Sequence, residues 1–239
     1  MPNKMNVFVK IFCIVGFVLA FTSAAQSLWA GEGWFSPYLE ARLGGSYTQI
    51  DSIRNTTDVA NPAPVNMTST DDLVAVMGLA AGMNFKKLGV PVRSEIEYAY
   101  HTELNYNPDP VFVGAGIPTR AKTKVDSHVL LANFYYDIET GTAFTPYVGA
   151  GLGAAWNVTK ATGTVIATGA SAEYNRTTVA LAWDVCAGCA YALSDKWKIT
   201  GGYRFLDLGK VVWGDHNTAQ LTSKEIVSHE VLVGLRYEF

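Results

Sequence analysis

Residues 230–239 read Glu-Val-Leu-Val-Gly-Leu-Arg-Tyr-Glu-Phe and end the chain in a strict alternation. The apolar positions are Val231, Val233, Leu235, Tyr237 and Phe239. The positions between them are Glu230, Leu232, Gly234, Arg236 and Glu238. Successive side chains of a β-strand point to opposite faces, so this segment predicts a strand with one apolar, aromatic-ended face. Such a face suits the lipid-facing wall of a transmembrane β-barrel.

The same alternation of apolar and polar residues recurs along the chain at period two. It predicts eight strands, at about 36–48, 72–85, 91–102, 124–138, 145–158, 174–192, 196–209 and 225–239. Eight is an even number and the smallest usual size of a barrel of this kind. The expected fold is therefore all-β, an eight-stranded antiparallel transmembrane β-barrel.

The connections between these strands alternate between short and long. Three are short, at 86–90, 139–144 and 194–195, and four are long and polar, at 49–71, 103–123, 159–173 and 210–224. Short periplasmic turns and long extracellular loops are typical of this architecture. The pattern places both chain ends of the barrel in the periplasm.

The N-terminus has the features of an export signal. Lys4 and Lys10 supply positive charge, the apolar run Ile11–Phe21 follows, and Ser23-Ala24-Ala25 fits a small-residue cleavage site. We expect residues 1–25 to be a cleaved signal peptide, with a second possible cut after residue 30, and residues 26–239 to form the barrel domain. An uncleaved anchor is the alternative, but the apolar run is short for a span of about 20 residues.

The polar face of the predicted strands carries charges of both signs. It holds Glu40, Arg42, Arg93, Glu95, Glu97, Asp184, Lys198, Arg204, Glu230, Arg236 and Glu238. A soluble lipocalin-like barrel would turn its apolar face inward, whereas a membrane barrel turns the apolar face to lipid. A lumen of eight strands is narrow enough to be filled by side chains. These residues are therefore expected to form a salt-bridged network in the lumen, and acid–base catalysis by paired carboxylates is the alternative.

The remaining composition argues against other classes of protein. Removing residues 1–25 takes away two lysines and no acid, which leaves 16 basic against 21 acidic residues and no indication of nucleic-acid binding. His101 and His128 could approach each other near the outer ends of adjacent strands, but no spacing supports a metal site. Ser228 and His229 are consecutive on one strand and point oppositely, so no catalytic triad is seen. We expect no catalytic residue, no metal and no cofactor, and hence not an enzyme.

Three segments resemble the opacity-porin-like family of small bacterial outer-membrane β-barrels. They are Tyr147–Trp156 (YVGAGLGAAW), Gly202–Gly209 (GYRFLDLG) and the terminal Tyr-Glu-Phe. The resemblance covers the mature chain and implies location in the outer membrane, contact with outer-membrane lipid, and assembly by the barrel-assembly machinery. In such barrels a terminal Phe with Tyr two residues before it is the assembly signal, which here falls on Tyr237 and Phe239. The family includes adhesins, antigens and haem binders, so the resemblance does not fix a function.

Function is expected on the loops that a rigid scaffold holds. The loop at 103–123 carries apolar side chains between prolines, and Tyr106, Phe112 and Ile117 are candidate contacts. The leading interpretation is a non-enzymatic surface protein whose extracellular loops contact outside molecules or a host-surface ligand. A purely structural envelope barrel and a narrow porin-like channel are the alternatives, followed by an enzyme acting on membrane lipid.

Overall fold

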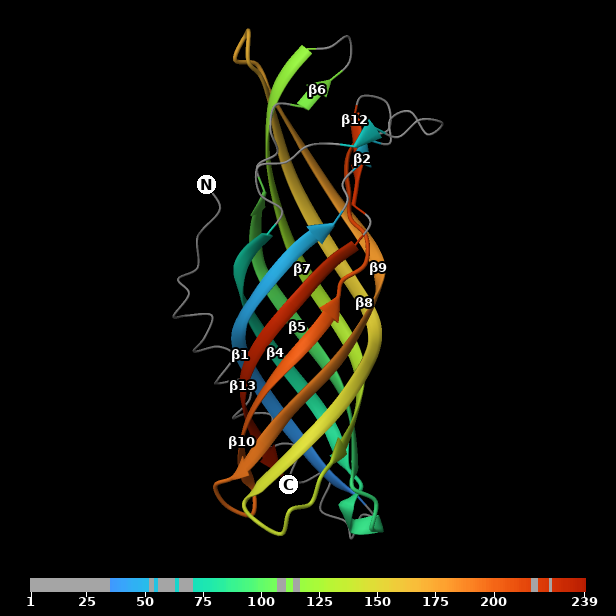
Figure 1. Cartoon of the computed structure of the whole chain (residues 1–239), viewed down its shortest axis with the longest axis vertical. Helices are drawn as coiled ribbons and strands as arrows, with labels where there is room; N and C mark the ends of the chain where they lie inside the picture. Colours follow the sequence, from blue (N-terminus) through green and yellow to red (C-terminus); the bar gives the residue numbers. More distant parts are fainter. Residues whose placement is uncertain are drawn as a thin grey trace.

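The computed structural model describes residues 35–51, 54–55, 63–64, 71–106, 111–113, 117–215, 219–223 and 225–239. Eight long strands form the body of the molecule (Figure 1). They are β1 (Ser36–Asp51), β4 (Asp71–Asn84), β5 (Val92–Tyr106), β7 (Ile117–Asp137), β8 (Phe144–Val165), β9 (Ser171–Ala192), β10 (Trp197–Asp207) and β13 (Glu225–Glu238). The predicted signal peptide lies outside the described residues.

The eight strands close into a barrel in which each strand pairs antiparallel with its neighbour in the chain. The first and last strands complete the ring, because β1 pairs with β13 from Tyr38 opposite Glu238 to Asp51 opposite Glu225. The ring continues through β4, β5, β7, β8, β9 and β10 back to β13. Closure leaves no sheet edge within the ring, which a chain in lipid requires because hydrocarbon offers no hydrogen bonds. The predicted eight-stranded antiparallel barrel is confirmed.

The two ends of the barrel differ, and all four connections expected to be long loops are partly strand. The end of β1, β2 (Arg54–Asn55) and β3 (Ala63–Pro64) lie within 49–71. At the end near the C-terminus the connections are short, and one holds the single turn η1 (Lys86–Leu88). At the other end β8 and β9 extend so far that only residues 166–170 remain between them. The expected loop at 159–173 is therefore wrong. β6 (Val111–Val113) and the start of β7 occupy much of 103–123, and β11 (Val212–Asp215) and β12 (Ala219–Thr222) occupy much of 210–224.

The outward face of the barrel is apolar and is bounded by aromatic side chains at two levels. Leu43, Ile96, Leu152 and Val233 are among the apolar side chains that remain more than half exposed. Toward the C-terminal end, the rings of Trp197 and Tyr237 lie 4.8 Å apart, as do those of Phe144 and Tyr191. Toward the other end, Trp183 packs on Phe205 and Tyr98 donates to or accepts from His128. Aromatic girdles flanking an apolar band are typical of transmembrane barrels.

The inward face is filled in two layers. The half near the C-terminus holds charged side chains, and the half near the extended strands holds an apolar cluster that includes Ile50, Leu104, Leu206, Leu208 and Ile226. Serine, threonine and asparagine side chains separate the two layers, and Thr48 shares a 2.8 Å hydrogen bond with Ser228 there. Among the described residues, no helix is long and apolar enough to cross a membrane.

Candidate functional site

The centre of the charged layer is Arg42, which projects from β1 across the lumen. Its Nη1 lies 2.6 Å from both Glu95 Oε1 and Glu97 Oε2, its Nη2 donates to Glu95 Oε2 at 3.0 Å, and its Nε donates to Glu40 at 2.9 Å. One guanidinium therefore bridges three carboxylates on two strands. The planar fork of five donors in arginine suits such an arrangement, and charge-assisted bonds of this length are among the strongest in proteins.

A second cluster lies beside the first, around Arg204 on β10. Arg204 Nε donates to Glu230 Oε2 at 2.8 Å and Nη1 donates to Glu97 Oε1 at 2.9 Å. Glu97 thus accepts from both Arg42 and Arg204 and joins the two clusters. On the far side of the lumen, His101 Nε2 lies 2.6 Å from Glu230 Oε1.

Two further arginines complete the charged layer. Arg236 Nε donates to Glu40 Oε2 at 2.7 Å. Arg93 Nε donates to both carboxylate oxygens of Asp137, at 3.0 and 2.8 Å. Asp137 was not predicted among the lumen charges. Lys198 and Glu238 pair at 2.8 Å near the C-terminal rim. Each charged residue proposed for the lumen from the sequence therefore has a partner of opposite charge within 4 Å, and the longest of these contacts joins Asp184 to Arg204 at 3.8 Å.

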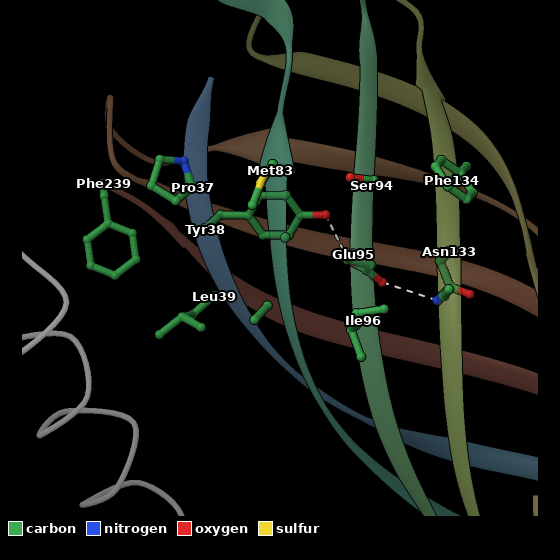
Figure 2. Close-up of a pocket in the computed structure, with 13 residues that line it drawn as sticks. Pro37, Tyr38, Leu39, Met83, Ser94, Glu95, Ile96, Asn133, Phe134 and Phe239 are labelled. Carbon is green, nitrogen blue, oxygen red and sulfur yellow. Dashed lines mark hydrogen bonds between the residues drawn. The ribbon is translucent and has the colours of Figure 1, made fainter. Parts of the chain in front are cut away.

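Tyrosine and asparagine side chains support the carboxylates. Tyr38 donates to Glu95 Oε2 at 2.8 Å and Tyr135 donates to Glu95 Oε1 at 2.7 Å. Figure 2 shows Tyr38 and Asn133 reaching Glu95 from opposite sides. The alternation that marked Glu95 as inward-facing also marks Asn133 and Tyr135, so their partnership could have been found from the sequence by following the same face.

Glycines on the neighbouring strands provide the space that these large side chains occupy. A methyl group at Gly149 would collide with the ring of Tyr135, and one at Gly234 would stand 2.8 Å from Glu40 Oε1. A methyl group at Gly151 would collide with Asn133 Oδ1 and lie 2.6 Å from Asp184 Oδ1. The alternate glycines of β8 therefore have a packing role, because interiors are filled at the density of organic crystals.

Asp184 and Asn133 leave polar atoms without partners among the described residues. Both carboxylate oxygens of Asp184 and Oδ1 of Asn133 are buried and accept no hydrogen bond. Asn133 Oδ1 and Asp184 Oδ1 both lie beside Gly151. An unmatched buried acceptor is costly, so this is the least satisfied point of the charged layer.

The lumen leaves little free space. A hollow beside Arg42, Tyr147 and Cys186 measures about 30 Å³, and one beside His101 and Leu104 in the apolar layer measures about 10 Å³. The larger is about the volume of one water molecule. Among the described residues, the charged layer and the apolar layer together occupy the barrel interior along its length.

The histidines and the serine considered for other chemistry are kept apart. His101 faces the lumen, where it contacts Glu230, whereas His128 faces outward and shares a 2.7 Å hydrogen bond with Tyr98. Ser228 bonds Thr48 inside the barrel while His229 bonds Tyr203 outside it. Within the part of the chain that the structure describes, no group of three metal-binding side chains occurs.

The extended ends of β7, β8 and β9 form a ribbon that rises above the rest of the barrel (Figure 1). β10 pairs with β9 only as far as Asp207 opposite Trp183, and beyond that point β8 is the only described strand that pairs with β9. Every side chain from Ser171 to Thr177 is exposed. At the tip, Val165 donates its N–H to the Ala170 carbonyl at 2.9 Å and Gly169 adopts a φ of 71°.

The structure describes the side chains of the terminal strand, but it describes only the backbone of the three predicted loop contacts. The ring of Tyr237 packs on Trp197 and, at 5.1 Å, on Phe239, whose N–H donates to the Pro37 carbonyl at 3.0 Å. The backbone of Tyr106 lies in β5, that of Phe112 in β6 and that of Ile117 in β7. The side chains of these three loop residues lie outside the described part of the structure.

Comparison with known proteins gives a consistent assignment of fold. A family model described as outer membrane protein beta-barrel domain matches residues 15–239. The outer membrane protein PagN of Salmonella typhimurium is 28% identical over 242 residues, which cover 95% of this chain and 97% of PagN.

Solved structures of similar fold come from other bacteria. The outer membrane protein OprG from Pseudomonas aeruginosa matches with a TM-score of 0.50 and 18% identity, over 85% of this chain and 96% of OprG. Neisserial surface protein A matches with a TM-score of 0.47 and 17% identity, over 87% of this chain and 99% of that protein. These likenesses concern the fold alone.

Proposed function

Because the chain belongs to the outer membrane protein beta-barrel domain family and resides in the bacterial outer membrane, we propose that it is a non-enzymatic surface protein that contacts outside molecules through its extracellular end. The observation that carries this proposal is the division of the molecule into a filled barrel and an exposed ribbon. Binding residues are commonly placed on segments that a rigid scaffold holds.

The charged layer supplies the rigidity of that scaffold. Glu97 joins the Arg42 and Arg204 clusters, so that salt bridges connect β1, β5, β10 and β13 across the lumen. Removing one partner of such a buried pair leaves an uncompensated charge, which makes the arrangement all-or-none. The barrel therefore holds the ends of β7, β8 and β9 in fixed positions.

The ribbon supplies the contact surface. Glu173, Tyr174 and Arg176 offer an anion, an aromatic ring and a cation on one exposed stretch of β9. Tyrosine and arginine are enriched where proteins bind one another. The loop residues Tyr106, Phe112 and Ile117 remain part of the proposal as a second contact region at the same end of the barrel.

The channel alternative is less well supported. Among the described residues, the lumen holds a hollow of about 30 Å³ in its charged half and one of about 10 Å³ in its apolar half. Apolar constrictions of this kind exclude water and ions. A cell-binding experiment distinguishes a purely structural barrel from the proposed surface-contact protein.

The test compares binding of intact cells to host cells and matrix components. One variant replaces residues 159–176 with Asn-Gly, which removes Glu173, Tyr174 and Arg176 and joins the paired residues Val158 and Thr177 by a two-residue hairpin turn. A second variant shortens residues 107–116. Tyr174→Ser removes one aromatic ring from the ribbon and leaves the length of both regions unchanged. We expect the ribbon-shortened cells to lose binding while the barrel still resists SDS before boiling. Unchanged binding in both shortened variants would overturn the proposal and favour a structural barrel.

We also propose that residues 1–25 are removed on export, with the cut after residue 30 as the alternative. N-terminal sequencing of the mature protein from outer membranes tests this. A chain that begins at residue 26 or 31 is the expected result, and an intact N-terminus would contradict it.

A further inference from the structure

A hollow of about 330 Å³ lies on the outward face of the barrel near the C-terminus (Figure 2). Its floor consists of small side chains in adjacent strands, namely Ala81 on β4, Ser94 on β5 and Ala132 on β7. Strand register explains the hollow. Ala81 and Ala132 both pair with Ile96, and Ser94 stands between Met83 and Phe134, so large outward residues surround the small ones.

The hollow opens into the region that lipid occupies. Ile96 and Phe134 at its edge are 53% and 62% exposed, although both are large and apolar. Phe239 lies at another edge, beside Pro37 and Leu39. The hollow belongs to the apolar outward band, on the side of the inner leaflet, so a hydrocarbon chain fits its chemistry.

The turn directly below the hollow is cationic. Residues 85–91 connect β4 and β5, the two strands that carry Ala81 and Ser94, and they include Lys86 and Lys87. Lys86 Nζ lies 3.0 Å from Glu139 but is 67% exposed, and Lys87 is exposed. Among the described residues, the other two turns at this end contain Glu139 and the pair Asp195 and Lys196, so neither carries excess positive charge.

We propose that the hollow and the cationic turn together bind an anionic phospholipid of the inner leaflet. One acyl chain lies in the hollow above Ala81, Ser94 and Ala132, and the phosphate group lies at Lys86 and Lys87. Lipid tails elsewhere are as apolar as the hollow, so the hollow positions the chain while the lysines discriminate among headgroups. The inference rests on the outer-membrane location and is independent of the function proposed for the ribbon.

The test measures retention of phosphatidylglycerol and of phosphatidylcholine by the folded, detergent-purified protein in native mass spectrometry. Two variants address the two parts of the site. Lys86→Gln/Lys87→Gln removes the charge, and Ala132→Leu fills the hollow from its outward-facing floor. Lys122→Gln/Lys124→Gln makes the same charge change at the other end of the barrel. Ala187→Leu adds the same bulk to the outward face of β9, where its paired residues Val148 and Tyr203 do not line the hollow.

The wild-type protein and both control variants are expected to retain phosphatidylglycerol in preference to phosphatidylcholine. Lys86→Gln/Lys87→Gln is expected to retain it about 30-fold less well, since each lysine near a membrane surface contributes about 1 kcal/mol. Ala132→Leu is expected to lower retention because its side chain takes the place of the acyl chain. Glycerol phosphate, which has the charge without the chains, is expected not to bind. Equal retention of the two lipids, equal loss in the control variants, or normal retention by Ala132→Leu would each overturn the proposal.

Discussion

His101 Nε2 lies 2.6 Å from Glu230 Oε1, although β5 and β13 are separated by β4 and β1 in the wall of the barrel. The contact therefore crosses the lumen. Glu230 accepts in addition from Arg204 on β10, so one carboxylate connects three strands. Such cross-lumen contacts fill the interior of the barrel with side chains.

Glu230→Ala is expected to lower the free energy of unfolding by about 3–5 kcal/mol, because Arg204 then stays buried without its main partner. Urea unfolding in lipid vesicles, followed by the difference in gel mobility between folded and boiled protein, measures the change. Glu173→Ala, on the exposed ribbon, serves as control. A loss no greater than that of Glu173→Ala would show that Glu230 does not hold the lumen together.

Asp184→Asn is expected to leave stability unchanged or to raise it by about 1 kcal/mol. Neither Asp184 oxygen accepts a hydrogen bond among the described residues, while the new amide could donate to Asn133 Oδ1 across Gly151. The same urea experiment decides the matter. A loss comparable to that of Glu230→Ala would mean that Asp184 has a partner the present structure does not show.

Gly151→Ala is expected to destabilise the barrel by about 1–3 kcal/mol through overpacking. Its methyl group would collide with Asn133 Oδ1 and crowd Asp184. Gly201→Ala is the matched control, because nothing lies within 4 Å of a methyl group there. Equal effects of the two substitutions would contradict a packing role for Gly151.

Deletion of Phe239 is expected to reduce the amount of folded protein in the outer membrane, because Phe239 contributes a ring packed edge-on against Tyr237 and a hydrogen bond to the Pro37 carbonyl. Surface labelling of intact cells measures assembly, and refolding of the purified chain in vesicles serves as control. Reduced assembly with normal refolding would identify an assembly signal, whereas normal surface levels would refute it.

The wild-type protein is expected to show no steady conductance steps in a planar bilayer, because side chains fill both layers of the lumen. The Glu230→Ala variant provides a comparison in which the charged layer is disturbed. Regular steps in the wild type would restore the narrow channel as a function of this protein.

Period-two alternation predicted the strands and the direction each side chain faces, because burial on one side of a wall imposes that period. Arg42, Glu95 and Glu97 were placed in the lumen on this basis, and the structure joins them directly. The cross-lumen pairing of His101 with Glu230 was not predictable, since alternation fixes the face of a residue and leaves its height in the barrel open.

The extent of the extracellular strands was also missed. Residues 159–165 and 171–173 are rich in Thr, Gly, Ala and Ser, so they look like a loop when judged by composition. They nevertheless pair as strands, because the ladder that starts at Phe144 opposite Tyr191 continues without a break to Thr164 opposite Ser171. The apolar layer of the lumen was also not predicted, because an apolar residue that faces inward interrupts the alternation of apolar outward and polar inward positions.

Under the proposed contact function, the unbroken β8–β9 ladder would set the distance at which another cell is engaged. From Trp156, at the outer aromatic girdle, to Val165 at its end, β8 continues for nine residues, or about 30 Å along the strand. A cell-surface molecule could therefore be engaged at the level of the sugar chains that coat a bacterium, without reaching the bilayer. The length of those sugar chains would then decide whether the tip is presented or shielded, so the same protein could be adhesive on a sparsely coated cell and silent on a densely coated one.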